Sequence, residues 1–245
     1  MLFIVVVLSL SNKVTVSQFW GNLLAGQTNG QNLTESNSSS QSDGSDLKNL
    51  YSPYAILVDV SSEEIMSEHN SSEKIYPASL TKIMTAILAI ENTPNLEQHI
   101  TLPYEIFPSL YAENASMAGF QPEENVSLKD LLYGIMLPSG AECCIAFAEH
   151  ISGSEQQFVS LMNEKAKELG MKNTHFINST GLHNSEHYST VEDISILLQY
   201  ALKNEDFRAA FTSSSYSTHS SEQHPEGFTF YSTMFKYMDS TEVVG

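Results

Sequence analysis

Basic residues are scarce in this chain of 245 residues. Eleven lysines and arginines stand against 29 aspartates and glutamates, giving a formal net charge of −18 at pH 7. Binding of nucleic acid requires clustered lysines and arginines that neutralise phosphates, so the composition argues against a nucleic-acid partner. The acidic excess identifies no function by itself, because a solvated acidic surface is its ordinary explanation. With 41% hydrophobic residues, the chain is suited to a globular fold.

Cysteine is almost absent. The two cysteines, Cys143 and Cys144, are adjacent, and neighbouring side chains on a helix point in different directions. A disulfide framework is therefore not expected, and no further cysteine completes a zinc–thiolate site. We interpret both as small buried thiols. His175, His183 and His187 lack the helical spacing of zinc ligands and are interpreted as polar loop residues.

Long hydrophobic runs are missing beyond the first residues. The run within residues 1–17, "MLFIVVVLSLSNKVTVS", is long enough for a signal-peptide core but short for a membrane span. No positive charges precede it, so a buried strand is the alternative. Residues 18–50 are rich in Ser, Asn, Gln and Gly and bury too little apolar surface to order themselves. We expect a signal peptide or N-terminal anchor over 1–17, a disordered linker over 18–50 and a folded domain over 51–245.

The folded part is expected to begin with a hairpin and a buried helix. "YAILVDV" and "SSEEIMSEHN", residues 54–70, predict two short strands around a polar turn. Residues 78–91, "ASLTKIMTAILAIE", are apolar on nearly every helical face. Such a segment is typical of a central helix that is buried on all sides.

Three further helices are indicated by their N-caps. In each, a serine or threonine stands three positions before an acidic residue or glutamine and ahead of apolar residues: Ser127 with Asp130, Ser154 with Gln157, and Thr190 with Asp193. Gly170 is expected to end the second of these helices. Beyond about residue 212 the composition favours strands, and the aromatic residues at 228–237 are expected in a strand core. Together these elements predict a mixed α/β (α+β) domain.

A polar pair interrupts the apolar central helix. In "YPASLTKIMTA", residues 76–86, Ser79 and Lys82 are three positions apart and share a helix face, with Cβ atoms about 5–6 Å apart. A lysine in an apolar site favours its neutral form and can accept the serine proton. Free N–H groups at the helix start can stabilise an oxyanion. By itself the pair also fits a serine near a helix cap beside a lysine that reaches water.

A second motif strengthens the catalytic interpretation. "LLYGIMLPSGAECCIAFAEH", residues 131–150, places Ser139 in a Pro-Ser-Gly turn between two apolar helices. With Ser79 and Lys82, this pattern resembles the penicillin-binding D-alanyl-D-alanine carboxypeptidases, relatives of the serine β-lactamases with the motifs Ser-x-x-Lys, Ser-x-Asn and Lys-Thr-Gly. Other segments, among them "AILVDV" and "HYSTVEDISILLQYAL", follow in the family's order and spacing.

The resemblance implies a β-lactamase/D,D-peptidase-like fold, an antiparallel sheet flanked by helices with a helical subdomain. It implies removal of the terminal D-alanine from peptidoglycan stem pentapeptides through an acyl-enzyme on Ser79. Lys82 would be the base, and Ser139 would belong to the relay that protonates the leaving group. β-Lactams would acylate the same serine, and no metal or organic cofactor is implied. The enzyme would act in cell-wall biogenesis, exported to the extracytoplasmic face of the envelope, with membrane association through the N-terminus or a C-terminal helix.

Two departures from the family pattern stand out. Ala141 replaces the asparagine of Ser-x-Asn, whose amide can hydrogen-bond substrate and lysine, so we expect altered rather than abolished activity. Lys-Thr-Gly does not occur, and "STG" at 179–181 belongs to the family's Phe-x-Asn-x-x-Gly-Leu segment instead. The tail "STMFKYMDSTEVVG" resembles what precedes Lys-Thr-Gly. We therefore expect a chain that stops short of that strand, with its sheet incomplete at the C-terminus.

Two other functions stay open at this stage. A β-lactamase-like hydrolase on the same scaffold needs a dedicated deacylating base, and Glu186, the nearest candidate, is interpreted as a polar loop residue. A non-catalytic envelope protein that binds peptidoglycan or β-lactams is favoured by Ala141 and the absent third motif. The intact Ser79, Lys82 and Ser139 favour the carboxypeptidase.

Overall fold

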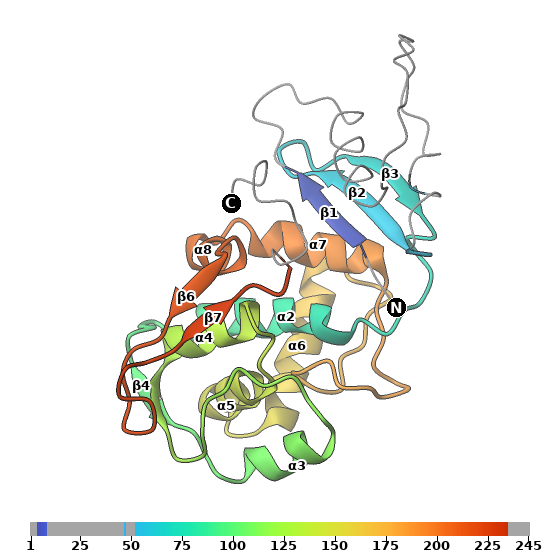
Figure 1. The fold of residues 1–245 in the computed structure, drawn as a ribbon. Coiled ribbons are helices and arrows are strands. Elements are labelled where there is room, and N and C mark those ends of the chain that lie inside the picture. The colour runs from blue at the N-terminus through green and yellow to red at the C-terminus, as the bar shows by residue number, and fades with distance from the viewer. Residues whose placement is uncertain (1–3, 9–46, 48–51, 235–245) are drawn as a thin grey trace, which may run out of the picture.

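The predicted N-terminal hairpin is present in the computed structural model, which describes residues 4–8, 47 and 52–234 (Figure 1). Strand β2 (Ala55–Asp59) pairs antiparallel with β3 (Ile65–His69), and the register shifts between Leu57 and Val58. Strand β1 (Ile4–Leu8) adds a parallel neighbour on the other side of β2. Helix α7 (Val191–Ala201) packs against β1 and β2 (Figure 1).

The N-terminal predictions fall mostly outside the described residues. Within 1–17, Ile4–Leu8 forms strand β1, which was the alternative to an export signal. Of the linker predicted over 18–50, only Leu47 is described, and it is buried. In the part of the chain that the structure describes, no helix has the length and apolar character needed to cross a bilayer.

The predicted central helix starts with one 3₁₀ turn, η2 (Ala78–Leu80), and continues as α2 (Thr81–Glu91). Every residue from Thr81 to Ile90 is buried, which confirms the prediction from its apolar faces. Five helices lie around α2, namely α4 (Leu128–Met136), α5 (Ala141–Ser152), α6 (Glu155–Leu169), α7 and α8 (Glu205–Phe211). A shorter helix, α3 (Ile106–Ala112), packs against α5. The shared core has phenylalanines as its largest fully buried side chains, among them Phe107, Phe147, Phe158 and Phe176.

The three predicted N-caps are confirmed. The side chains of Ser127, Ser154 and Thr190 accept hydrogen bonds from backbone N–H groups three residues later, as the capping pattern requires. Gly170 ends α6 in the left-handed conformation, with φ of 81°.

Two short antiparallel sheets complete the described fold. One joins β4 (His99–Thr101) to β5 (Asn125–Ser127), and the other joins β6 (Ser215–Ser217) to β7 (Thr229–Tyr231). The expected strand-core role of the late aromatic residues holds for Phe230, which is buried. It is wrong for Tyr231, which is 71% exposed because it points to the opposite face of β7.

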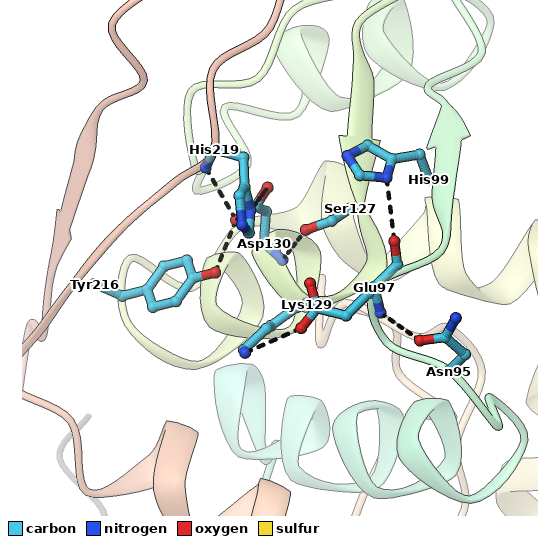
Figure 2. Close-up of polar contacts among 8 residues, drawn as sticks. All are labelled: Asn95, Glu97, His99, Ser127, Lys129, Asp130, Tyr216 and His219. Carbon is cyan, nitrogen blue, oxygen red and sulfur yellow. Dashed lines mark hydrogen bonds and ion pairs between the residues drawn. The ribbon is translucent and has the colours of Figure 1, made fainter.

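The β6–β7 hairpin is attached to the helical part through buried carboxylates. Asp130, in the first turn of α4, accepts hydrogen bonds from the hydroxyl of Tyr216 at 2.9 Å and from Nδ1 of His219 at 3.1 Å (Figure 2). Glu124 contacts Nδ1 of His224 in the same way at 2.9 Å. Asp130 is 2% exposed and Glu124 is 1% exposed, so in both attachments the carboxylate is buried.

Candidate active site

The structure brings Ser79, Lys82 and Ser139 into contact. Ser79 is an exposed residue of the 3₁₀ turn, while Lys82, one turn later in α2, is only 6% exposed. Lys82 Nζ lies 3.4 Å from Ser79 Oγ, and Ser139 Oγ donates a hydrogen bond to Ser79 Oγ at 3.0 Å. A solvent-facing hydroxyl is thus held between a buried amine and a second hydroxyl, as the motif spacing predicts.

Ser139 reaches Ser79 because of its backbone conformation. It lies in the turn between α4 and α5 and has φ of 67°, in the left-handed region that L-residues rarely adopt. Gly140 follows, and its N–H donates to the carbonyl of Gly134 at 2.8 Å. Strained backbone at such a position is typical of functional sites, where the surrounding structure fixes it.

Lys82 has a second contact that the sequence did not predict. Its Nζ donates to the backbone carbonyl of Thr180 at 2.7 Å. Thr180 lies in the loop formed by residues 176–182, which carry the Phe-x-Asn-x-x-Gly-Leu pattern. Asn178 folds this loop, since its Oδ1 accepts from Gly181 N–H at 2.7 Å. No described carboxylate forms an ion pair with Lys82, so its acceptor here is a neutral backbone carbonyl.

The same loop packs directly on the backbone that precedes the nucleophile. Gly181 has φ of 80°, and a Cβ added there would lie 1.9 Å from the carbonyl oxygen of Ala78. Ala78 itself has φ of 48°. Glycine is therefore required at 181 both for conformation and for space.

Two further hydrogen bonds hold the loop to helices. The hydroxyl of Thr85, one turn after Lys82, donates to the carbonyl of Ser179 at 2.7 Å. Glu155, the first residue of α6, accepts from both the N–H and the hydroxyl of Ser179, at 2.8 and 2.6 Å. Ser179 is fully buried, so these bonds are sheltered from competing water.

Of the three histidines interpreted as polar loop residues, His187 is the buried one. This residue does lie in a loop, but it is only 2% exposed. Its Nδ1 accepts from Ile177 N–H at 3.2 Å, and its Nε2 lies 2.8 Å from the hydroxyl of Thr81. Burial, with a smaller effect of His175, lowers the pKa of His187 to about 4. The neutral ring thus joins the loop to the start of α2.

The other two histidines have separate partners. His175 Nδ1 lies 2.8 Å from the carbonyl of Glu186, and the ring of His183 packs edge-on against Tyr76 with centroids 4.7 Å apart. Over the described ranges, no three His, Cys, Asp or Glu side chains are placed to hold a metal ion.

Both cysteines are fully buried in α5, which confirms their interpretation as core thiols. Burial is the main cause that raises the pKa of Cys144 to about 12 and raises the pKa of Cys143 well above its usual value. Neither thiol is therefore an alternative nucleophile to Ser79.

Ala141, the departure from the Ser-x-Asn pattern, is the first residue of α5 and is 1% exposed. Its N–H donates to the carbonyl of Ser116 at 2.8 Å. The methyl group offers no hydrogen bond, so among the described side chains the polar partner of Ser79 in this motif is Ser139.

Comparison with known protein families gives a match over most of the chain. The peptidase S11 family, described as D-alanyl-D-alanine carboxypeptidase, matches residues 37–241. Among curated proteins, the D-alanyl-D-alanine carboxypeptidase DacF of Bacillus subtilis is 42% identical over 155 residues, which cover 62% of this chain and 39% of that protein. The D-alanyl-D-alanine carboxypeptidase DacC of Escherichia coli is 35% identical over 150 residues, covering 58% of this chain and 37% of its own length. The chain thus spans about two fifths of the length of these relatives.

Solved structures give the same fold. The DD-transpeptidase of Streptomyces K15 superposes with a TM-score of 0.66 at 28% sequence identity, covering 71% of this chain and 70% of that one. Penicillin-binding protein 6B of Escherichia coli superposes with a TM-score of 0.65 at 25% identity, over 73% of this chain and 56% of its own. The predicted β-lactamase/D,D-peptidase-like fold is therefore confirmed.

Proposed function

Since the chain belongs to the D-alanyl-D-alanine carboxypeptidase family, we propose that it is a serine D,D-carboxypeptidase acting on peptidoglycan stem peptides. The observation that carries this proposal is the contact of Ser79 with Lys82 on one side and with Ser139 on the other. Each of the three residues stands at the position that the family motif assigns to it.

Acylation uses the three side chains in turn. Lys82, as the neutral amine, takes the proton of Ser79 while Ser79 Oγ attacks the carbonyl carbon of the penultimate D-alanine. The N–H groups at the start of the 3₁₀ turn, which helix geometry leaves without a partner inside the turn, would stabilise the developing oxyanion. The C–N bond then breaks, and Ser139 donates its proton to the departing amine of the terminal D-alanine. Lys82 returns the proton to Ser139.

Hydrolysis completes the cycle. Water attacks the ester carbonyl on Ser79, its proton passes to Lys82, and the shortened peptide leaves with its new carboxylate. Ser79 regains its proton from Lys82. β-Lactams follow the first half of this path, because opening of their strained amide leaves the amine tethered to the acyl group. They therefore serve as acylating probes of the same serine.

The proposed substrate implies export of the chain. An enzyme for peptidoglycan acts outside the cytoplasm, so we propose that the chain is exported, with residues 1–17 as the export or anchoring segment. The β-lactamase alternative receives no support from the site, since among the described residues no carboxylate forms a hydrogen bond with Ser79.

The test is intact-mass spectrometry after incubation with benzylpenicillin. The chain should gain the mass of one penicilloyl group, and Ser79→Ala should gain none while keeping the same circular dichroism spectrum. A folded chain without an adduct would contradict the proposal for this polypeptide. An adduct that persists in Ser79→Ala would contradict the choice of nucleophile.

A further inference from the structure

Glu142, the second residue of α5, is a fully buried acidic side chain next to the Ser139 turn. One of its oxygens, Oε1, accepts two backbone hydrogen bonds, from Ala118 N–H at 2.7 Å and from Gly119 N–H at 3.0 Å. Both donors belong to the loop that follows α3. The carboxyl group therefore joins this loop to the beginning of α5.

The other oxygen of Glu142, Oε2, is buried and has no hydrogen-bond partner among the residues that the structure describes. A buried polar atom without a partner lowers stability, so its presence needs an explanation. Burial is the main cause that raises the pKa of Glu142, and the surrounding N–H groups act in the opposite direction. An alanine or leucine would avoid the unpaired oxygen but would lose both loop contacts.

The Ser139 turn is packed tightly against this carboxyl group. A Cβ added to Gly140 would lie 2.6 Å from the Cβ of Ala118 and 3.0 Å from Glu142 Oε2. The N–H of Ala141 donates to the carbonyl of Ser116 in the same loop. The residue immediately after Ser139 is thus held between the loop and the glutamate, with almost no free space.

We propose that Glu142 is a positioning residue for Ser139, an inference that rests on the proposed function. Glu142 touches neither Ser79 nor Lys82 through a hydrogen bond. It acts by holding the 116–119 loop against Gly140, which keeps Ser139 in its left-handed conformation with the hydroxyl aimed at Ser79. The unpaired oxygen is retained because the two loop contacts require a carboxyl or amide group at this position.

The kinetic test separates positioning from stability. Acylation by benzylpenicillin is measured as the saturating rate k2 and the half-saturation concentration K′, below the melting temperature of every variant. Glu142→Ala should lower k2 about 10- to 100-fold, because misplacement of a reacting group by about 1 Å has effects of that size. K′ should change less than twofold. Glu142→Gln keeps an acceptor oxygen and should recover most of k2.

The matched control is Glu149→Ala. Glu149 lies two turns further along α5, is partly exposed, and makes no side-chain hydrogen bond to a described residue. The k2 of Glu149→Ala should stay within twofold of the k2 of the unmodified chain. If Glu142→Ala does not fold, Glu142→Asp, which is one methylene shorter, replaces it with the same expected loss of k2.

A second measurement does not depend on acylation. Hydrogen exchange should be at least tenfold faster at Ala118, Gly119 and Ala141 in Glu142→Ala than in the unmodified chain, and near normal in Glu142→Gln. Unchanged exchange at these amides, or an unchanged k2 in a folded Glu142→Ala, would overturn the positioning role. If the unmodified chain gives no adduct, the proposed function fails, and hydrogen exchange alone decides the role of Glu142.

Discussion

Lys82 is held by a backbone carbonyl rather than by a carboxylate. The Thr180 carbonyl, at 2.7 Å, fixes the position of Nζ without adding a full negative charge beside it. A carboxylate at that distance would favour the ammonium form and would oppose a general base. The choice of a neutral acceptor therefore agrees with the role of Lys82 as the group that accepts the serine proton.

Replacement of Lys82 by alanine should abolish acylation while leaving the chain folded. We expect at least a 1,000-fold lower acylation rate, roughly the upper range for the loss of a general base. Stopped-flow or mass-spectrometric acylation by benzylpenicillin measures the rate, and circular dichroism checks the fold. Lys172→Ala, at an exposed residue, is the matched control and should acylate normally. A normal rate in Lys82→Ala would exclude Lys82 as the base.

A methyl group at Gly181 should displace the loop that carries Thr180. The added Cβ would collide with the Ala78 carbonyl, and φ of 80° is strained for alanine. We expect Gly181→Ala to slow acylation at least tenfold and to lower the free energy of unfolding by about 1–3 kcal/mol. Gly170→Ala is the control, since it has a similar φ but open space around its Cβ. Gly170→Ala should lower the free energy of unfolding by a comparable amount, because the backbone strain is similar, and should keep the normal acylation rate.

The sequence predicts the side chains of the candidate site better than its backbone contacts. The spacing of Ser79 and Lys82 places them on one helix face, and the resemblance to the D-alanyl-D-alanine carboxypeptidases adds Ser139 and a role for each of the three residues. The Thr180 carbonyl could not be found in this way, since every residue has a carbonyl and only the folded loop selects one. Glu142 was passed over because a buried acid has no sequence signature that separates it from an exposed one.

Among the elements, helix ends were predicted more accurately than sheets. The caps at Ser127, Ser154 and Thr190 are local, so four residues of sequence suffice to define each of them. Strand pairing depends on residues far apart, and the parallel pairing of Ile4–Leu8 with β2 has no local signal. Tyr231 shows a related limit, because a composition rich in aromatics does not say which residues face inward.

The β6–β7 hairpin should loosen when its buried carboxylate is removed. Asp130→Ala leaves the Tyr216 hydroxyl and the His219 ring without their acceptor (Figure 2). A buried donor left without its acceptor costs about 1–3 kcal/mol, and the 53% exposure of the His219 side chain lets water replace part of its lost bond. Urea denaturation measures this loss as a change in the free energy of unfolding. Asp206→Ala, at an exposed helix position, should cost less than about 1 kcal/mol. Equal losses in the two variants would contradict the structural role of Asp130.

For the whole molecule, His187 predicts a loss of stability in acid. Its pKa is about 4 in the folded chain and near 6.5 when unfolded, so between these values only the unfolded state binds the proton. The free energy of unfolding should therefore fall as the pH is lowered from about 6.5 to about 4, by up to about 1.4 kcal/mol per pH unit from this residue. Above pH 6.5 it contributes no slope.

Urea unfolding at pH 7.5, 6 and 5 tests this slope. His187→Gln should be less stable than the unmodified chain at pH 7.5, because it loses the fitted ring between Thr81 and Ile177, but it should lose less stability on acidification. His69→Gln, at a residue outside this contact, should keep the full slope. Parallel slopes for His187→Gln and the unmodified chain would show that other groups control the acid response.

The contacts around Ser79 also set an order of events during folding. Ser79 meets Ser139 across 60 residues of sequence, and Lys82 meets Thr180 across 98. Closing loops of this length costs chain entropy and delays folding, and both must close before Ser79 has its proton donor and Lys82 is held in place. Reactivity toward penicillin should therefore appear late in refolding, after most helical circular dichroism has returned. A pulse of fluorescent penicillin would then act as a clock, labelling at each time only those molecules whose distant segments have already met.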